Sequence, residues 1–217
     1  MDKTRSIKET VSLIRDGMSI MIGGFMGVGN PHTIIDALVE KGVKELTIIA
    51  NDTSSPGFGL AKLIESKQVK KVITSHIGLN PETGRQMKTG ELEVVLVPQG
   101  TLAEQIRSGG AGLGGFLTPT GVGTIVEEGK KKIEIDGIQY ILELPLKADV
   151  ALINGARVDK KGNVYYDKAA RNFNPIMATA AELVIVEAEE LVEAGEIDPN
   201  DVMTPGIFVD VIVEGGK

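Results

Sequence analysis

Apolar and polar positions form two alternating patterns in the first half of the chain. Short apolar runs predict buried strands, and apolar residues at helical spacing predict amphipathic helices between them. The runs that predict strands are 19–22, 46–50, 69–74 and 91–97. The segments that predict helices are 6–16, 31–42, 59–66 and 101–107. Strands that alternate with helices at this spacing form an open, mostly parallel sheet with helices on both faces.

Two of the predicted helices have clear start signals. Ser6 and Glu9 form a capping box, which satisfies backbone N–H groups at a helix start. Asn30 and Pro31 are typical of an N-cap and a first helical residue, and Gly42 is placed to end that helix.

The pattern changes after Gly109. Residues 109–124 are too rich in Gly and Pro to predict a packed element, and 132–144 predicts an antiparallel hairpin that turns at Asp136-Gly137. The later elements expected are a strand at 150–154, a helix that opens at Asn174-Pro175, and strands at 183–186 and 207–213. Because no repeat or linker is visible, we expect residues 1–217 to form one α/β domain with a small antiparallel hairpin insertion.

Composition excludes several classes of function. The net charge of −7 and the low aromatic content argue against a nucleic-acid partner. The chain has no cysteine, which rules out disulfides and thiolate chemistry. The sequence has neither a long apolar run nor a signal-peptide pattern, so we expect a cytoplasmic protein that does not contact the membrane.

A glycine-rich loop between the first strand and its helix is the leading candidate site. Its residues are Gly23, Gly24, Phe25, Met26, Gly27, Val28, Gly29 and Asn30. Ligands of open α/β sheets bind at the carboxyl ends of strands, where glycines let backbone amides approach an anion or an oxyanion. A tight turn without a ligand is the alternative, but four glycines within seven residues exceed what a turn requires.

A second glycine stretch carries the string Gly-x-Gly-x-x-Gly at 110–115. A dinucleotide site needs a strand before this string and a helix after it. Here a helix precedes it and Pro119 follows, so a nicotinamide dehydrogenase is disfavoured. The stretch 109–124 suits an extended ligand or a subunit contact equally well.

Gln99 ends a strand and begins a helix, where its amide could hydrogen-bond a carboxylate or a thioester carbonyl; a plain helix-entry role is equally consistent with the sequence. We expect a surface role for His32 and a satisfied core position for His76. Two histidines without cysteine offer little for a transition metal, so we predict no metal site. No carboxylate has a setting that marks a nucleophile.

Several segments resemble one known family in order along the chain. The segment 16–25 (DGMSIMIGGF), with Gly29 and Pro31, resembles the first signature of the family I coenzyme A-transferases. Further segments similar to their α subunits of the acetate, acetoacetate and butyrate type are 50–53 (ANDT), 75–78 (SHIG), 98–101 (PQGT), 118–124 (TPTGVGT), 170–174 (ARNFN) and 203–206 (MTPG).

The resemblance implies an open α/β fold and an α/β subunit pair, commonly assembled as α2β2. It implies a ping-pong transfer of coenzyme A between acyl-CoA and short-chain carboxylates, through a glutamyl-CoA thioester. The glutamate belongs to a Ser-Glu-Asn-Gly signature of the β subunit, and that string is absent here. Carried over, residues 24–30 match the CoA-binding loop, and Gln99 matches a glutamine near the reacting carbonyl.

Two other classes remain open from the residues alone. A stand-alone sugar-phosphate isomerase or deaminase would need its own general base beside the loop, and no residue is well placed for that role. A non-catalytic CoA-binding module would need neither a partner nor Gln99. The preferred acyl group is not determined by the sequence, because contacts that separate such groups contribute only about 1–3 kcal/mol.

Overall fold

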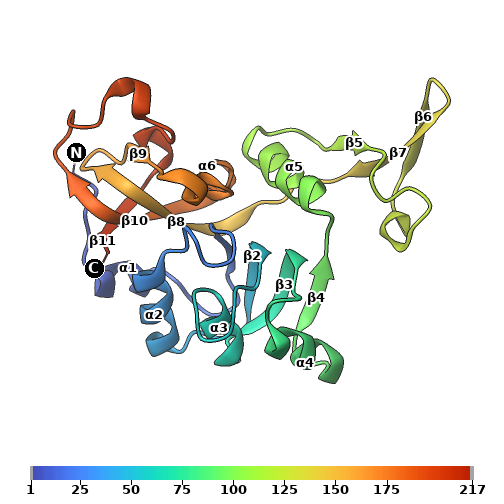
Figure 1. Ribbon diagram of the computed structural model, residues 1–217, viewed down its shortest axis with the longest axis horizontal. Helices are drawn as coiled ribbons and strands as arrows, with labels where there is room; N and C mark the ends of the chain where they lie inside the picture. The colour runs from blue at the N-terminus through green and yellow to red at the C-terminus, as the bar shows by residue number, and fades with distance from the viewer. Residues whose placement is uncertain (1, 216–217) are drawn as a thin grey trace.

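A computed structural model describes residues 2–215 of the chain, and Figure 1 shows its helices and strands. The helices are α1 (Ile7–Ser12), α2 (His32–Lys41), α3 (Ala61–Glu65), α4 (Pro81–Thr89), α5 (Gln99–Gly110) and α6 (Asn174–Met177). The strands are β1 (Ser19–Ile22), β2 (Leu46–Asp52), β3 (Val69–His76), β4 (Glu93–Leu96), β5 (Phe116–Thr118), β6 (Lys132–Ile135), β7 (Ile138–Glu143), β8 (Ala148–Asp159), β9 (Val164–Tyr165), β10 (Ala181–Val192) and β11 (Val211–Glu214). Four short 3₁₀ turns are 125–127, 168–171, 199–201 and 206–208.

The main sheet is open and mostly parallel, as predicted. Within the described residues its strand order is β11-β10-β8-β1-β2-β3-β4, and β9 pairs antiparallel with β8 at one side. The chain builds outward from β1 to β4 and then returns to the other side of β1. β1 therefore lies where the strand order reverses, the position at which open α/β sheets place their ligands.

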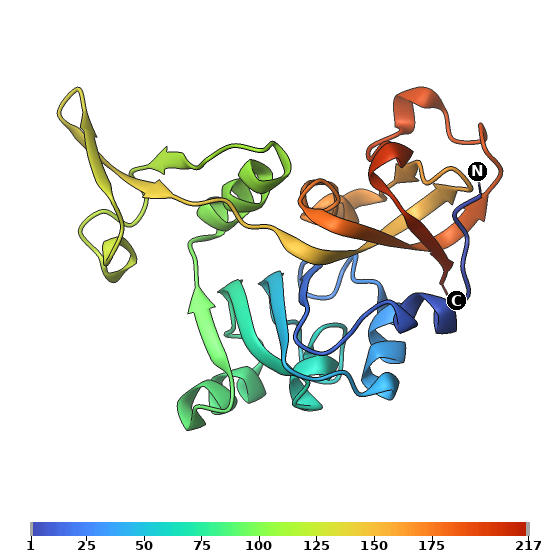
Figure 2. The same cartoon turned by 180° about the vertical axis from the view of Figure 1, so that it is seen from behind.

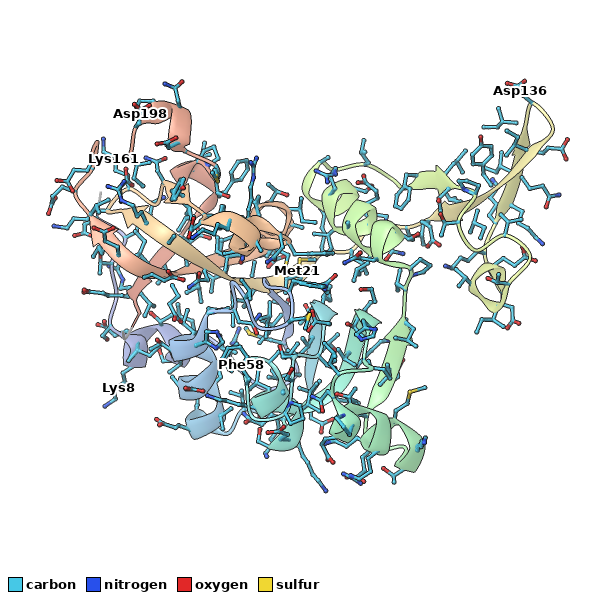
Figure 3. The ribbon with its side chains drawn as sticks, viewed as in Figure 1. Lys8, Met21, Phe58, Asp136, Lys161 and Asp198 are labelled. Carbon is cyan, nitrogen blue, oxygen red and sulfur yellow. The ribbon has the colours of Figure 1, made fainter. Side chains whose placement is uncertain are left out.

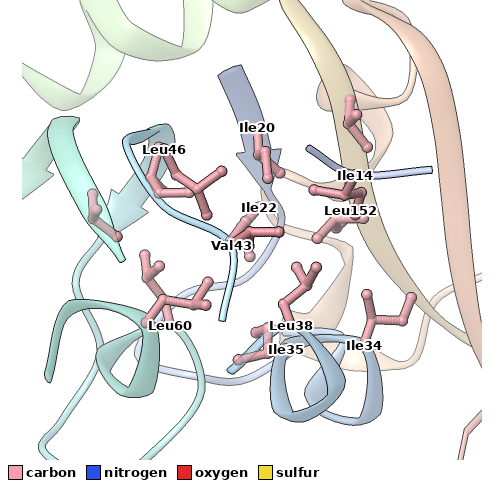
Figure 4. Packing of buried hydrophobic residues seen from close by; sticks show 14 of the residues in the cluster. Ile14, Ile20, Ile22, Ile34, Ile35, Leu38, Val43, Leu46, Leu60 and Leu152 are labelled. Atoms are coloured by element: carbon pink, nitrogen blue, oxygen red, sulfur yellow. The ribbon is translucent and has the colours of Figure 1, made fainter. Parts of the chain in front are cut away.

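The two faces of β1 pack into two different cores. Ile20 and Ile22 point to the side covered by α1, α2 and α3, while Met21 points to the side of α5 and α6. Figure 4 shows Ile20 and Ile22 beside Leu152 of β8 and above Leu38 of α2. All of these side chains are fully buried, and each such burial stabilises the fold by about 1.5–3 kcal/mol. The apolar run that forms β1 is therefore a strand covered on both faces.

A second, three-stranded antiparallel sheet projects from the rest of the molecule (Figures 1 and 2). The hairpin of β6 and β7 turns at Asp136-Gly137, both with positive φ as a type I′ turn requires, and Asp136 marks its tip in Figure 3. The expectation that 109–124 holds no packed element was wrong. Phe116 to Thr118 form β5, which pairs with β7 and adds a third strand to a hairpin that would be only marginally stable alone.

The structure also departs from the sequence prediction at α4 and at β11, and β8 and β10 extend well beyond the strands expected at 150–154 and 183–186. Helix α4 was not predicted because its residues are mostly polar; Asn80 caps it by accepting from the N–H groups of Glu82 and Thr83. The strand expected over 207–213 is shorter and later: 206–208 is a 3₁₀ turn, and only Val211–Glu214 pairs with β10.

Candidate active site

Polar side chains from two parallel strands and one helix meet at the carboxyl edge of the main sheet, beside the loop that follows β1. They border a pocket of about 420 Å³. The residues that line it are Phe25, Met26, Asn51, Asp52, Ser75, His76, Leu79 and Gln99. β1 leads into the glycine-rich loop, β2 ends at Asp52, β3 ends at His76, and Gln99 opens α5 after β4. The structure thus brings together the two sites that the sequence predicted separately, the loop and Gln99.

The crest of the glycine-rich loop is a tight two-residue turn. Phe25 and Val28 exchange backbone hydrogen bonds of 3.0 and 2.9 Å across it. Met26 and Gly27 lie between them with φ of 50° and 84°, the signature of a type I′ turn. Phe25, Met26 and Val28 are each more than 40% exposed, so the turn presents three apolar side chains at the rim of the site.

Most backbone N–H groups of this loop already have partners inside the protein. Gly24 donates to Asn172 Oδ1 at 3.1 Å, and Met26 donates to Asp52 Oδ2 at 2.8 Å. The N–H groups of 23, 25, 28 and 30 bond backbone carbonyls. Within residues 2–215, only the N–H groups of Gly27 and Gly29 in this loop lack an acceptor. The loop is therefore held mainly by hydrogen bonds inside the protein; Gly27 is buried, and neither it nor Gly29 lines the pocket.

The first two glycines are needed for packing within the protein. A Cβ on Gly23 would lie 1.8 Å from Asn174 Oδ1, and one on Gly24 would lie 2.0 Å from Asn30 Nδ2. Real Cβ atoms are not found this close to other heavy atoms. A side chain at Gly23 or Gly24 is therefore excluded by the loop's own supports before any ligand is considered.

Asn30 does not cap the following helix, contrary to the prediction. Helix α2 begins at His32 with Pro31 at the N-cap, and Asn30 is buried and points inward. Its Nδ2 donates to the carbonyl of Gly23 at 2.5 Å, and its Oδ1 accepts from Ser54 Oγ and from the Leu60 N–H. Asn30 therefore holds the two ends of the glycine-rich loop together.

The amino terminus of α2 is occupied by a carboxylate from another strand. Glu187 of β10 is 4% exposed and accepts from the N–H groups of Thr33 at 3.1 Å and Ile34 at 2.9 Å. The negative charge meets the positive end of the helix dipole. The positive potential at this helix terminus, which was expected to attract a ligand anion, is therefore neutralised by Glu187. No local sequence pattern links Glu187 to this helix.

Gln99 lies at the pocket in the first turn of α5. Its Nε2 donates to Asn51 Oδ1 at 2.6 Å, and Asn51 Nδ2 donates to Asp52 Oδ2 at 2.9 Å. Because Asp52 also accepts from Met26, one chain of hydrogen bonds connects Gln99 to the loop crest. Asn51 and Asp52 belong to segment 50–53, which carries part of the family resemblance, but no site role was predicted for them; their place at the end of a buried strand was the available signal.

The two histidines differ from expectation. His32 is half-buried; its ring stacks on Phe58 with centroids 4.6 Å apart, and its Nε2 contacts the Gly27 carbonyl at 3.1 Å. His76 is exposed and lines the pocket, so the core position expected for it was wrong. His76 is the last residue of β3; it pairs with Asp52 on β2 but lies beyond the last pairing of β3 with β4, at Thr74, which leaves that side open.

Glycines at the start of the second glycine stretch serve close packing. A Cβ on Gly109 would lie 1.9 Å from the Leu146 carbonyl oxygen, and one on Gly110 would lie 2.1 Å from Thr179 Oγ1. Both glycines end helix α5, and this position explains why the dinucleotide string fails here.

Neither a metal cluster nor a membrane-spanning helix is found in the described part of the chain. Among residues 2–215, no group of three or more His, Cys, Asp or Glu side chains is arranged to hold a metal ion. None of the helices in that range combines the length and apolar character needed to cross a bilayer.

Comparison with known proteins identifies the family. A model of the coenzyme A transferase family matches residues 4–215, and the chain belongs to that family. It is 56% identical over 211 residues to the acetate CoA-transferase subunit alpha of Escherichia coli K12, covering 97% of this chain and 96% of that relative. It is also 56% identical over 203 residues to the acetoacetyl-CoA:acetate/butyrate CoA transferase alpha subunit of Clostridium acetobutylicum, covering 94% and 93%.

A solved structure confirms the fold. An acyl-CoA transferase from E. coli O157:H7, in a thioester complex with CoA, superposes with a TM-score of 0.89 at 22% identity. The superposition covers 98% of this chain and 47% of that one, so this chain corresponds to about half of the larger polypeptide. The family resemblance and the open parallel fold predicted from the sequence are confirmed.

Proposed function

We propose that this chain is the α subunit of a short-chain acyl-CoA:carboxylate CoA-transferase that works with a β subunit carrying the catalytic glutamate. Two relatives at 56% identity are named as alpha subunits of such enzymes. The observation that carries the proposal is the pocket where Gln99 and the crest of the glycine-rich loop meet at the carboxyl edge of the sheet.

The proposed reaction has two half-reactions. The partner's glutamate attacks the acyl-CoA thioester, the CoA thiolate leaves, and it then opens the acyl-glutamyl anhydride to release the first carboxylate. The resulting glutamyl-CoA thioester is attacked by the second carboxylate, and the same steps run in reverse. Each attack on a carbonyl develops an oxyanion, so hydrogen-bond donors beside that oxygen accelerate the reaction.

This chain offers one such donor at the pocket. Gln99 Nε2 has two N–H bonds and uses one of them on Asn51, which leaves the other available to a substrate oxygen. Within residues 2–215 the N–H groups of Gly27 and Gly29 are the loop's backbone donors without an acceptor, but neither residue lines the pocket. We assign CoA contact to the loop residues 23–30 and the hydrogen bond to the reacting carbonyl or carboxylate to Gln99.

The pocket supports a short, uncharged acyl group. Its side walls include the apolar side chains of Phe25, Met26 and Leu79, and no Lys or Arg is among the described residues that line it. Acetyl, acetoacetyl and butyryl groups have no second carboxylate to pair, whereas a succinyl group has one. We therefore propose acetate, acetoacetate and butyrate as the acids. From the family resemblance we also propose CoA as the carrier, an α2β2 assembly with the β subunit, and a cytoplasmic location.

Reconstitution tests the proposal. The chain mixed with the β subunit should transfer CoA from acetyl-CoA or butyryl-CoA to a short carboxylate faster than from succinyl-CoA. Borohydride added after acyl-CoA should inactivate the complex, and mass mapping should locate the modification on the β subunit. Gln99→Ala should lower kcat about 100-fold, the usual loss for one oxyanion donor, without preventing assembly.

The same assays distinguish other functions. Turnover by the chain alone, or a borohydride label on this chain, would contradict the division between subunits. Tight CoA binding without transfer in the presence of the partner would instead indicate a CoA-binding module. As a control, Gln139→Ala changes an exposed glutamine on β7 and should leave kcat unchanged.

A further inference from the structure

We propose that Asp52, acting through Asn51, fixes which way the Gln99 amide faces, so that both are positioning residues for the transfer reaction. The inference rests on the function proposed for Gln99. It comes from the donors and acceptors along one chain of hydrogen bonds.

The chain of hydrogen bonds begins at a buried carboxylate. Asp52 is 5% exposed, and its Oδ1 accepts from the Ser54 N–H at 2.7 Å. Its Oδ2 accepts from the Met26 N–H at 2.8 Å and from Asn51 Nδ2 at 2.9 Å. Asp52 forms no ion pair within residues 2–215, so its charge is balanced by these three N–H donors.

The carboxylate dictates the orientation of Asn51. An ionised carboxylate only accepts hydrogen bonds, so Asn51 must turn its NH₂ group toward Asp52. Its Oδ1 then faces the opposite way and accepts from Gln99 Nε2. If Asn51 flipped, its oxygen would meet the oxygen of Asp52, and its NH₂ would meet the NH₂ of Gln99.

The backbone holds Asn51 in place. Asn51 is 1% exposed, and its carbonyl accepts from Thr74 Oγ1 at 3.0 Å and from Ser75 Oγ at 2.6 Å. Both ends of its buried side-chain amide are also hydrogen-bonded, so a change of rotamer would break both bonds. The hydrogen bond to Asp52 therefore fixes the Asn51 amide, and the Asn51 oxygen in turn fixes the NH₂ group of Gln99.

The orientation of Gln99 decides what the pocket offers a substrate. With its NH₂ group held by Asn51, Gln99 keeps a second N–H beside the pocket, and the plane of the amide is fixed. Because Asp52 also accepts from Met26, the same carboxylate sets the distance between this donor and the loop crest. An oxyanion site requires its donors to be fixed before the reaction begins.

A titration tests the orientation directly. Gln99→Glu places a carboxyl on an exposed residue, where folding is not at risk. If Asn51 is locked, it presents only its oxygen, and the introduced carboxyl group can bond that oxygen only when protonated. We expect the pKa of the introduced carboxyl, measured by carbon-13 NMR of the labelled chain, to be raised by about one unit above that of an ordinary glutamate.

The control for the titration removes the lock. In Gln99→Glu combined with Asn51→Ser, the pKa of the introduced carboxyl should return toward that of an ordinary glutamate. A lowered pKa in the single variant would mean that Asn51 has flipped to donate, and it would overturn the proposal. The same pKa with and without Asn51 would overturn it as well.

Kinetics of the complex test the positioning role. Asn51→Ser should lower kcat up to about 100-fold, the cost of a misplaced group, with KM for acyl-CoA within about twofold. In a Gln99→Ala background, Asn51→Ser should cause no further loss. Equal losses in both backgrounds would contradict a role exerted through Gln99, because they would reflect a general structural defect.

The chain contains a matched control. Asn163 also connects a carboxylate to an N–H group: its Nδ2 donates to Asp159 Oδ2 at 2.8 Å, and its Oδ1 accepts from Gly206 at 2.9 Å. It follows two positions after Lys161, which Figure 3 labels in a part of the molecule away from Met21 and Phe58. Asn163→Ser should leave kcat unchanged.

The two proposals fail in different ways. A wild-type complex that transfers no CoA would remove the proposed function, and with it the catalytic role of the pair. An active wild type that is slowed by Gln99→Ala but not by Asn51→Ser would remove only the positioning role.

Discussion

The carboxylate of Glu187, on strand β10, accepts a hydrogen bond from the backbone N–H of Ile34 in the first turn of helix α2, at 2.9 Å. The two residues are 153 positions apart in sequence. The bond joins the side of the sheet built last to the helix that follows the first strand.

Replacing Glu187 should therefore weaken the whole domain. In Glu187→Gln one side-chain oxygen becomes an NH₂ group that faces a helix N–H, and the charge that balances the helix dipole is lost. We expect the free energy of unfolding to fall by about 1–2 kcal/mol, measured by urea denaturation. Glu189→Gln, an exposed change on the same strand, should have little effect. Equal losses in the two variants would show that the cap contributes nothing.

Gly23 should tolerate no side chain. In Gly23→Ala the new Cβ would lie 1.8 Å from Asn174 Oδ1, so the loop and its support must separate. We expect a loss of stability of about 2–3 kcal/mol and impaired CoA binding by the complex. Gly84→Ala is the control, because no atom lies within 4 Å of its Cβ and alanine favours helices. It should melt at the same temperature as the wild type or higher.

Tyr166 should make the protein sensitive to alkali. Burial raises the pKa of its phenol, and the bond to Thr204 only partly opposes this effect. Above about pH 10 the unfolded chain releases the phenolic proton while the folded protein keeps it, so stability falls as the pH rises. Tyr166→Phe should be about 1 kcal/mol less stable at about pH 8, and this deficit should shrink as the pH passes about 10.

A partner variant separates the hydrogen bond from the ionisation. Thr204→Val removes the same 2.7 Å bond but keeps the phenol buried. It should lose similar stability at about pH 8 and still weaken in alkali relative to Tyr166→Phe. Parallel stability curves for wild type and Tyr166→Phe from about pH 8 to about pH 11, obtained by denaturant titration, would argue against this account.

The projecting sheet should depend on one buried carboxylate. Glu143, 2% exposed, accepts from Lys130 Nζ at 2.6 Å and from Gln105 Nε2 at 2.9 Å, which joins β7 to helix α5. Glu143→Gln leaves the lysine charge without its partner, and we expect faster proteolytic cleavage within residues 113–146. Glu127→Gln, which removes the more exposed pair with Lys132, should cleave at the wild-type rate. Unchanged cleavage in Glu143→Gln would contradict the proposed anchor.

Local pattern was enough for much of this protein. The apolar runs that became β1 to β4, the capping box at Ser6 and the type I′ turn at Asp136-Gly137 each depend on neighbours within a few residues, and all were confirmed. Motifs distributed along the chain were likewise enough to recognise the coenzyme A transferase family. Helix α4 was not predicted because its mostly polar residues do not form an apolar stripe.

Only the tertiary structure decided how the site is assembled. The sequence placed Gln99 and the glycine-rich loop at strand ends, but the sheet order made them neighbours, through Asn51 and Asp52. Buried polar groups must find partners wherever the fold brings donors and acceptors together. Asn30 therefore faces inward where a cap was expected. Propensity and periodicity act over a few residues, whereas these bonds join segments that only the folded sheet brings together.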